Sequence, residues 1–236
     1  MQKTLAAGRK KGRATDAIGR TARQNAHRQR LFATMILMTA PLPHNFYQRD
    51  AATVARELIG TILVRRYRGV VRRCRIVETE AYVGPHDLAC HAAKGRTPRT
   101  STMYLPGGHA YVYFIYGMYE MLNVVTGAKD DPQAVLIRAA EPLDDWKADL
   151  SGPGKLTRAL HITRAQNGLD LTGTELYFLG RQTGDQPRIH ISRRIGVDYA
   201  KHWRDAELRY YDAVSRHISK HPKGHRPKAV SAKDSS

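Results

Sequence analysis

The sequence predicts a single α+β domain. Runs rich in β-branched and aromatic residues lie between residues 61 and 140, with turn residues between them. Capping residues and helical periodicity precede and follow those runs. No Pro-, Gly- or Ser-rich linker divides residues 45–219, so this chain of 236 residues is expected to build one main core.

The first predicted elements are a helix and two strands. Asp50 can cap a helix that ends at Gly60, because apolar residues recur at helical spacing between them. Residues 61–67 and 70–83 are β-rich, and Arg68–Gly69 is predicted to turn the chain between these two strands.

A long polar segment, residues 84–108, follows and is predicted to be a loop with one helical turn around residues 88–93. The remaining predicted elements are a hairpin over residues 110–125, a strand at 134–140, a helix at 156–163, short strands at 175–179 and 188–191, and a last ordered segment at 203–211.

The hairpin is predicted to turn near Gly117–Met118, where two β-rich runs meet. With a strict two-residue turn, Tyr113 pairs with Leu122, which places Asn123 on the face opposite to Tyr113. A longer turn or a bulge would bring Tyr113 and Asn123 to the same face.

The charge of the chain points to a polyanionic partner. Lys and Arg total 39 against 21 acidic residues, which gives a formal net charge of +18. Nucleic acid is favoured over an anionic membrane, because no apolar run approaches the roughly 18 residues that a spanning helix needs.

Nine basic residues and one acid lie within residues 1–38. We expect residues 1–44 to be a basic, disordered extension, with Met35 or Met38 as an alternative natural start, and residues 220–236 to be a basic tail.

The two cysteines, Cys74 and Cys90, lack the spacing of a zinc site or a redox motif and are interpreted as reduced intracellular thiols. His91 follows Cys90 directly, but no further Cys or His pair lies at ligand spacing. We therefore expect no metal site.

The segment RIVETEAY, residues 75–82, places two carboxylates one residue apart in a strand. Alternation predicts that Ile76, Glu78, Glu80 and Tyr82 share one face, with the two glutamates about 6.6 Å apart. The simplest interpretation from these residues alone is a solvated strand edge, or pairing with nearby arginines.

Tyrosines gather on the same predicted strands and offer stacking faces for bases. The set comprises Tyr82, Tyr111, Tyr113, Tyr116 and Tyr119. Packing is the commoner role of a strand tyrosine. Tyr116 lies beside the predicted turn, where it could act as a wedge in a DNA groove.

The basic loop at residues 91–101 suits phosphate contact, although a solvated loop explains it equally. Residues 152–155 lack the spacing of a phosphate-binding Walker sequence. These features favour nucleic-acid binding and do not define a reaction.

The assembled motifs resemble the alkyladenine or 3-methyladenine DNA glycosylase family over residues 45–212. They are ARELIG, RIVETEAY, GPHDLACHA, YVYFIYGMY, LN, LIRAAEPL and GPGKLTRAL, in this order. The resemblance implies a mixed α/β domain around a curved, mainly antiparallel sheet that presents a β-hairpin to DNA. It also implies excision of damaged purines from a flipped nucleotide, without a cofactor.

The resemblance implies roles for individual residues. Glu80 corresponds to the general base that activates water, and Arg138 to the arginine that helps to hold this water. Tyr82, His91 and Tyr113 correspond to residues that contact the flipped base. Asn123 corresponds to the residue that crowds the 2-amino group of guanine.

A second set of residues is expected to contact DNA outside the base pocket. Tyr116 corresponds to the side chain that fills the space left by the base. Arg96, Thr97, Met103 and Tyr119 fall where the family contacts the backbone or the minor groove. Val214 stands where the family usually has a glycine, which could narrow the approach to the lesion.

The implied enzyme is monofunctional: water attacks the sugar and an abasic site remains. We expect double-stranded DNA with damaged purines as its partner, a monomer, no membrane, and an intracellular location, in the cytoplasm or nucleoid of a bacterium or the nucleus of a eukaryote. Two alternatives remain open at this point, a non-catalytic binder of lesions or structured nucleic acid, and an RNA-binding protein. A helix-hairpin-helix glycosylase is disfavoured by the strand-rich residues 61–140.

Overall fold

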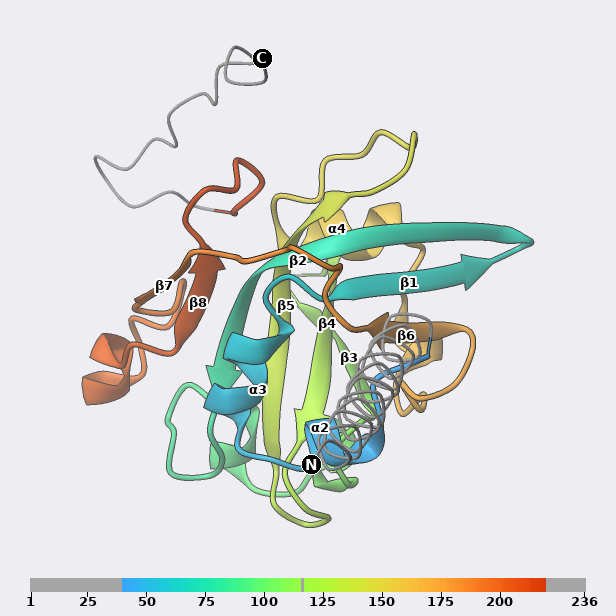
Figure 1. Ribbon diagram of the computed structural model, residues 1–236. Coiled ribbons are helices and arrows are strands. Elements are labelled where there is room, and N and C mark those ends of the chain that lie inside the picture. The colour runs from blue at the N-terminus through green and yellow to red at the C-terminus, as the bar shows by residue number, and fades with distance from the viewer. Residues whose placement is uncertain (1–39, 116, 220–236) are drawn as a thin grey trace, which may run out of the picture. The chain divides into compact units, whose positions relative to one another are not determined.

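The computed structural model describes residues 40–115 and 117–219 (Figure 1). The predicted C-terminal tail, most of the predicted N-terminal extension, and Tyr116 lie outside the described residues. The folded unit begins at Pro41, which bridges to Leu179, and the Leu42 amide donates to the Phe178 carbonyl at 2.7 Å. In the described part of the chain, every helix is too short or too polar to cross a bilayer.

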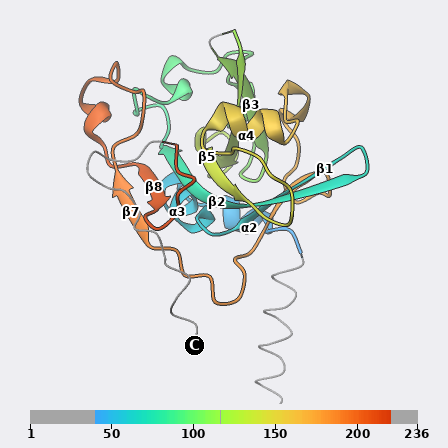
Figure 2. The ribbon, with the colours of Figure 1, turned by 90° about the horizontal axis from the view of Figure 1, so that it is seen from above.

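A curled antiparallel sheet of eight strands dominates the described residues (Figures 1 and 2). Its order is β3-β4-β5-β2-β1-β6, and β8 pairs with both β2 and β7. The strands are β1 (Ile62–Tyr67), β2 (Val70–Tyr82), β3 (Ala110–Ile115), β4 (Tyr119–Thr126), β5 (Gln133–Pro142), β6 (Leu176–Leu179), β7 (Ile189–Ser192) and β8 (Arg209–Asp212). With few helices beside it, this sheet confirms the predicted α+β class.

The helices are short. They are α2 (His44–Tyr47), α3 (Ala51–Leu58), α4 (Pro153–Ala159), and the 3-10 turns η1 (His91–Lys94), η2 (Ser101–Tyr104), η3 (Arg164–Gln166) and η4 (Lys201–Asp205). The cap predicted for α3 is present, because the Asp50 carboxylate accepts from the Thr53 amide at 2.8 Å. The helix predicted at 156–163 instead begins at Pro153, whose fixed φ suits the first helical position.

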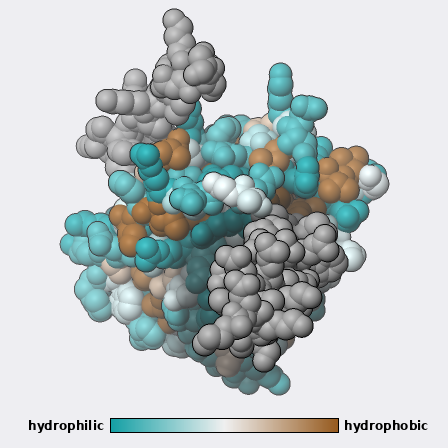
Figure 3. Space-filling view, viewed as in Figure 1, coloured by the Kyte–Doolittle hydropathy of each residue, from teal (hydrophilic) through white to brown (hydrophobic). Residues whose placement is uncertain are grey.

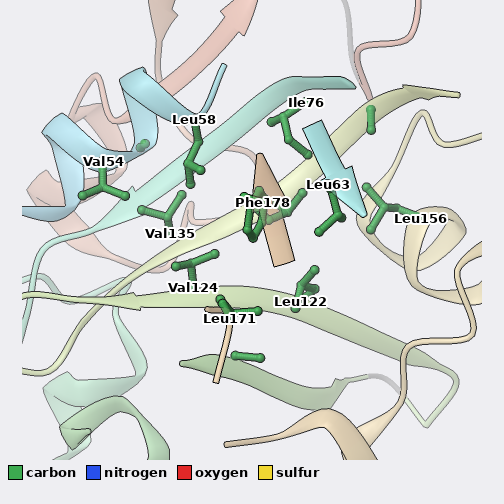
Figure 4. Packing of buried hydrophobic residues seen from close by; sticks show 14 of the residues in the cluster. Val54, Leu58, Leu63, Ile76, Leu122, Val124, Val135, Leu156, Leu171 and Phe178 are labelled. Atoms are coloured by element: carbon green, nitrogen blue, oxygen red, sulfur yellow. The ribbon is translucent and has the colours of Figure 1, made fainter. Parts of the chain in front are cut away.

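One main core lies between the sheet and helices α3 and α4 (Figure 4). Val54 and Leu58 of α3, Leu156 of α4 and Phe178 of β6 belong to the same buried cluster, together with alternate residues of the central strands. The opposite face of β2, β4 and β5 is therefore left free for polar side chains.

The faces of β2 differ from the alternation predicted by the sequence. Ile76 packs in the main core, and the Thr79 hydroxyl donates to the Ala55 carbonyl of α3 at 2.8 Å. Register shifts between Ile76 and Glu78, and again between Glu78 and Thr79, explain the difference. The first shift places an extra residue, Val77, in β2 and slips the alternation of this strand by one position, whereas the second places an extra residue, Arg138, in β5. Glu78 and Glu80 thus point to the same side as predicted, while Ile76 does not.

The hairpin registers depend on the two turns. Tyr111 pairs with Asn123, and Tyr113 pairs with Met121, so three residues link β3 to β4. The strict two-residue turn is wrong, and Asn123 lies on the face of both tyrosines. In contrast, Tyr67 pairs with Val70 across a two-residue turn.

The β1–β2 hairpin reaches beyond the rest of the sheet (Figure 1). Arg68 and Gly69 at its turn both have positive φ, 49° and 77°, as a type I′ hairpin turn requires. Figure 3 shows an apolar patch at this end of the molecule within a largely hydrophilic face. Val70 and Val71 are exposed there.

Candidate active site

The free face of the sheet brings the predicted residues together in cross-strand rows. Strand pairing aligns Tyr111 of β3, Asn123 of β4, Leu136 of β5 and Glu80 of β2. Residues two positions away along each strand share this face. The neighbouring rows hold Tyr113, Met121 and Arg138 on one side, and Tyr82 and Ala134 on the other.

A cavity of about 260 Å³ opens on this face. Aromatic side chains, an amide and a guanidinium line it, together with a backbone segment from the loop after β7. The lining residues used below are Tyr82, His91, Met103, Tyr111, Tyr113, Asn123, Arg138 and Ile195. Apolar walls with a few convergent polar groups are typical of a small-ligand site.

Glu80 lies directly beneath this lining and is fully buried. Its Oε2 accepts from the Tyr82 hydroxyl at 3.0 Å and from Arg138 Nη1 at 3.2 Å, and its Oε1 accepts from the Ile195 amide at 2.7 Å. Each of the three donors lines the cavity. The carboxylate is therefore held at one place beside the cavity by charge-assisted hydrogen bonds.

Glu78 is also fully buried, so the solvated-edge interpretation is wrong. Its Oε1 accepts from Arg209 Nε at 2.7 Å and Arg138 Nε at 3.2 Å, and its Oε2 accepts from the Ser219 amide. Glu78 thus pairs with arginines, as the other interpretation of the sequence held. Burial disfavours the charge of Arg138, yet Glu80 and Glu78 outweigh it and raise the pKa of Arg138.

The aromatic wall is composed of neutral side chains. His91 Nδ1 lies 2.9 Å from the Tyr111 hydroxyl, and the His91 ring meets the Tyr113 ring edge-on at 4.5 Å between centroids. Burial, with the positive Arg99 and Lys94 nearby, lowers the pKa of His91 to about 4. Burial raises the pKa of Tyr111 to about 12.

Asn123 is held in a fixed orientation at the cavity. Its side-chain amide donates to the backbone carbonyls of Tyr111 and Met121 at 3.2 and 3.3 Å. Because both amide hydrogens are engaged, the side-chain oxygen is left as the group that can accept from a ligand.

Sequence reasoning missed a buried ion pair that supports the site. Arg194 and Asp87 are both fully buried as side chains, and Arg194 Nη2 donates to Asp87 Oδ1 at 2.8 Å. The Arg194 guanidinium also lies over the Tyr82 ring, 4.8 Å from its centroid. Arg194 directly precedes Ile195, whose amide binds Glu80. The sequence shows only an arginine in a polar segment, without a sign of its distant partner.

The described residues that were predicted to contact DNA lie in three different surroundings. Arg96 and Thr97 are exposed on the loop beside the cavity, where Arg96 pairs with Asp130 at 3.2 Å. Tyr119, at the start of β4, packs against Gly154 of α4, where an added Cβ would lie 2.5 Å from its ring. Met103 is only 1% exposed and lines the cavity, so it lies in the wall of the candidate base pocket, and its predicted contact with the DNA backbone or minor groove stays a prediction.

Val214 is 53% exposed and lies outside the cavity lining formed by the described residues. Its side chain therefore does not narrow this cavity. The resemblance to the family suggests a narrower approach to the lesion, because the family usually has a glycine at this position.

The model of the methylpurine-DNA glycosylase family matches residues 45–216, a range that contains every residue of the cavity lining. The class of protein is thus a DNA glycosylase, a hydrolase that acts on N-glycosidic bonds in DNA repair. The chain belongs to the methylpurine-DNA glycosylase family.

Bacterial relatives agree with this assignment. A Myxococcus xanthus protein, provisionally named 3-methyladenine DNA glycosylase, is 50% identical over 77% of this chain and 94% of its own length. Proteins with the same provisional name from Legionella pneumophila and an Anaeromyxobacter species are 46% and 47% identical, over 76% and 77% of this chain and 98% and 93% of their own lengths.

Proposed function

We propose that the protein is a monofunctional glycosylase that removes alkylated purines from double-stranded DNA. In this proposal 3-methyladenine and 7-methylguanine are the main substrates, and hypoxanthine and ethenoadenine are weaker ones. Water attacks the sugar C1′ of a flipped nucleotide, the N-glycosidic bond breaks, and an abasic site remains. The protein acts as a monomer.

The observation that carries the proposal is the position of Glu80 under an aromatic cavity. A flipped base would lie between Tyr82 and the Tyr113–His91 wall, and the reacting sugar would lie near Arg138 and the Ile195 backbone. Glu80 is hydrogen-bonded to two of these groups, so it is within reach of a water that they hold. The Tyr82 hydroxyl also donates to Oε2 of Glu80, and in this proposal that bond opens or lengthens when water enters.

The character of the cavity supports cationic bases as the better substrates. A methylated purine such as 3-methyladenine carries a positive ring, which leaves readily and stacks favourably between aromatic rings. A neutral base needs a proton on its leaving nitrogen. His91 would be a poor source of this proton near neutral pH, since its pKa lies at about 4.

Asn123 and the DNA-contacting residues give the proposal its specificity. The Asn123 side chain, fixed by two carbonyls, would crowd the 2-amino group of guanine and so slow the release of guanine bases relative to adenine bases. Tyr116 fills the gap left by the flipped base. Arg96, Thr97 and Tyr119 contact the duplex beside it.

Single-turnover assays on defined duplexes test the proposal. Duplexes that contain one 3-methyladenine, 7-methylguanine, hypoxanthine or ethenoadenine are mixed with excess enzyme, and both base release and strand integrity are followed. We expect release from the methylated duplexes without strand cleavage. Tight lesion binding without any base release would contradict the proposal.

A further inference from the structure

A strip of surface continues from the candidate active site along helix α4. Pro153, the first residue of α4, is one of the residues that line the first cavity. A second cavity, of about 490 Å³, continues along the helix past Gly154 and Arg158. A third, of about 280 Å³, reaches the β1–β2 hairpin at Arg68 and shares Tyr67 and His161 with the second.

This strip is basic. Four arginines line the second and third cavities, Arg65, Arg68, Arg72 and Arg158, against one carboxylate, Glu120. Arg65 is buried and paired with Glu175 at 2.6 Å, so the accessible positive charge of the strip comes from the other three. Glu120 already lies 3.5 Å from Arg164. Arg68 and Arg158 are exposed and have no carboxylate partner among residues 40–115 and 117–219. These two guanidinium groups are free to bind an anion from solution.

Aromatic rings hold the arginines in place. Tyr67 and His161 stack with their centroids 4.9 Å apart. The guanidinium of Arg68 lies 5.2 Å from the centre of the Tyr67 ring, and that of Arg158 lies 6.0 Å from the centre of the Tyr119 ring. Such contacts reduce the rotamer freedom that each cation would lose on binding a phosphate.

We propose that this strip binds the phosphate backbone of the DNA duplex that flanks the lesion. The inference rests on the proposed function, because it assigns the flanking duplex of the same substrate to this surface. The seven residues of α4 extend about 10 Å, which corresponds to roughly three base pairs along one strand. The duplex that leaves the cavity along α4 thus meets Arg158 first and Arg68 on the β1–β2 hairpin next.

The test uses the full chain and a double variant, Arg68→Asn with Arg158→Gln. Asparagine tolerates the positive φ of position 68. The matched control is Arg188→Gln, which removes an exposed arginine beside β7, on the other side of the molecule from β1 (Figures 1 and 2). Equilibrium binding is measured on a lesion duplex of about 30 base pairs, and on versions trimmed on one flank to about 4 base pairs, across a salt series.

We expect the double variant to bind the full duplex about tenfold more weakly at low salt, with a salt slope smaller by about 2. When one of the two flanks is trimmed, the double variant and the parental chain should bind with equal affinity. Equal binding of this trimmed duplex also shows that the double variant is folded. The Arg188→Gln control should keep the parental affinity and slope.

The inference would be overturned if the double variant bound the full duplex with the parental affinity and salt slope. It would also be overturned if the double variant bound both trimmed duplexes more weakly than the parental chain does. Base release by the parental chain is scored separately. Its absence would refute the proposed function, whereas its presence beside unchanged binding in the double variant would refute only this inference.

Discussion

Arg138 Nη1 lies 3.2 Å from Glu80 Oε2, while Nε of the same guanidinium lies 3.2 Å from Glu78 Oε1. One buried arginine thus bridges both carboxylates of the RIVETEAY segment. The pair is not symmetric, since only Glu80 also binds donors that line the cavity.

The Glu80→Gln variant should lose at least about 100-fold in single-turnover base release while it still binds lesion DNA, because it lacks the carboxylate that activates water. Glu78→Gln should instead lose about 3–5 kcal/mol of unfolding free energy, because Arg138 and Arg209 lose a buried negative partner. Denaturant unfolding and rates corrected for the folded fraction separate the two effects. Parental base release by Glu80→Gln would refute its role as the base.

Asp87→Asn tests the support that lies behind the cavity. The substitution leaves the Arg194 guanidinium buried without its counter-charge, which should cost about 3–5 kcal/mol of unfolding free energy. Base release should also fall, because Arg194 positions the Ile195 amide that binds Glu80. Asp144→Asn, which removes the partner of Arg73 in an exposed pair, is the matched control and should change stability by less than about 1 kcal/mol.

His91 should make folding stability depend on pH. An unfolded histidine has a pKa near 6.5, whereas burial and the nearby cations lower the pKa of His91 to about 4. Between these values the unfolded chain binds more protons, so the free energy of unfolding falls as pH drops from about 6.5 to about 4. Above that window the contribution of neutral His91 is fully present.

The measurement compares the parental chain with His91→Gln, which does not titrate. On acidification through this window, the parental chain should lose on the order of 1–3 kcal/mol more unfolding free energy than the variant. Parallel pH profiles for the two proteins would contradict the assigned shift.

Asn123→Ser should relax the exclusion of guanine. The smaller side chain removes the amide that projects into the cavity, so release of 7-methylguanine and of undamaged guanine should rise relative to 3-methyladenine. Competition between these bases in matched duplexes measures the ratio. A ratio equal to the parental one would show that another group excludes guanine.

The sequence by itself determined which segments form strands, helices and turns, but it did not determine how the strands pair. The strand-rich runs, the Asp50 cap and the turn at Arg68–Gly69 were predictable, because each depends on residues that are close in the chain. The resemblance of the motifs also pointed to Glu80, Tyr82, Tyr113 and Asn123 as one site. Local pattern alone did not distinguish Glu80 from Glu78.

Tertiary structure decided what local pattern left open. The bulge at Val77 in β2 turned Ile76 into the core, and a three-residue link placed Asn123 beside Tyr111 and Tyr113. These registers depend on pairing with other strands, which no local pattern encodes. The Asp87–Arg194 pair joins residues 107 positions apart, and its energy comes from removing both charges from water together. Only the folded chain brings these charges together, and with them the amide that holds Glu80 in place.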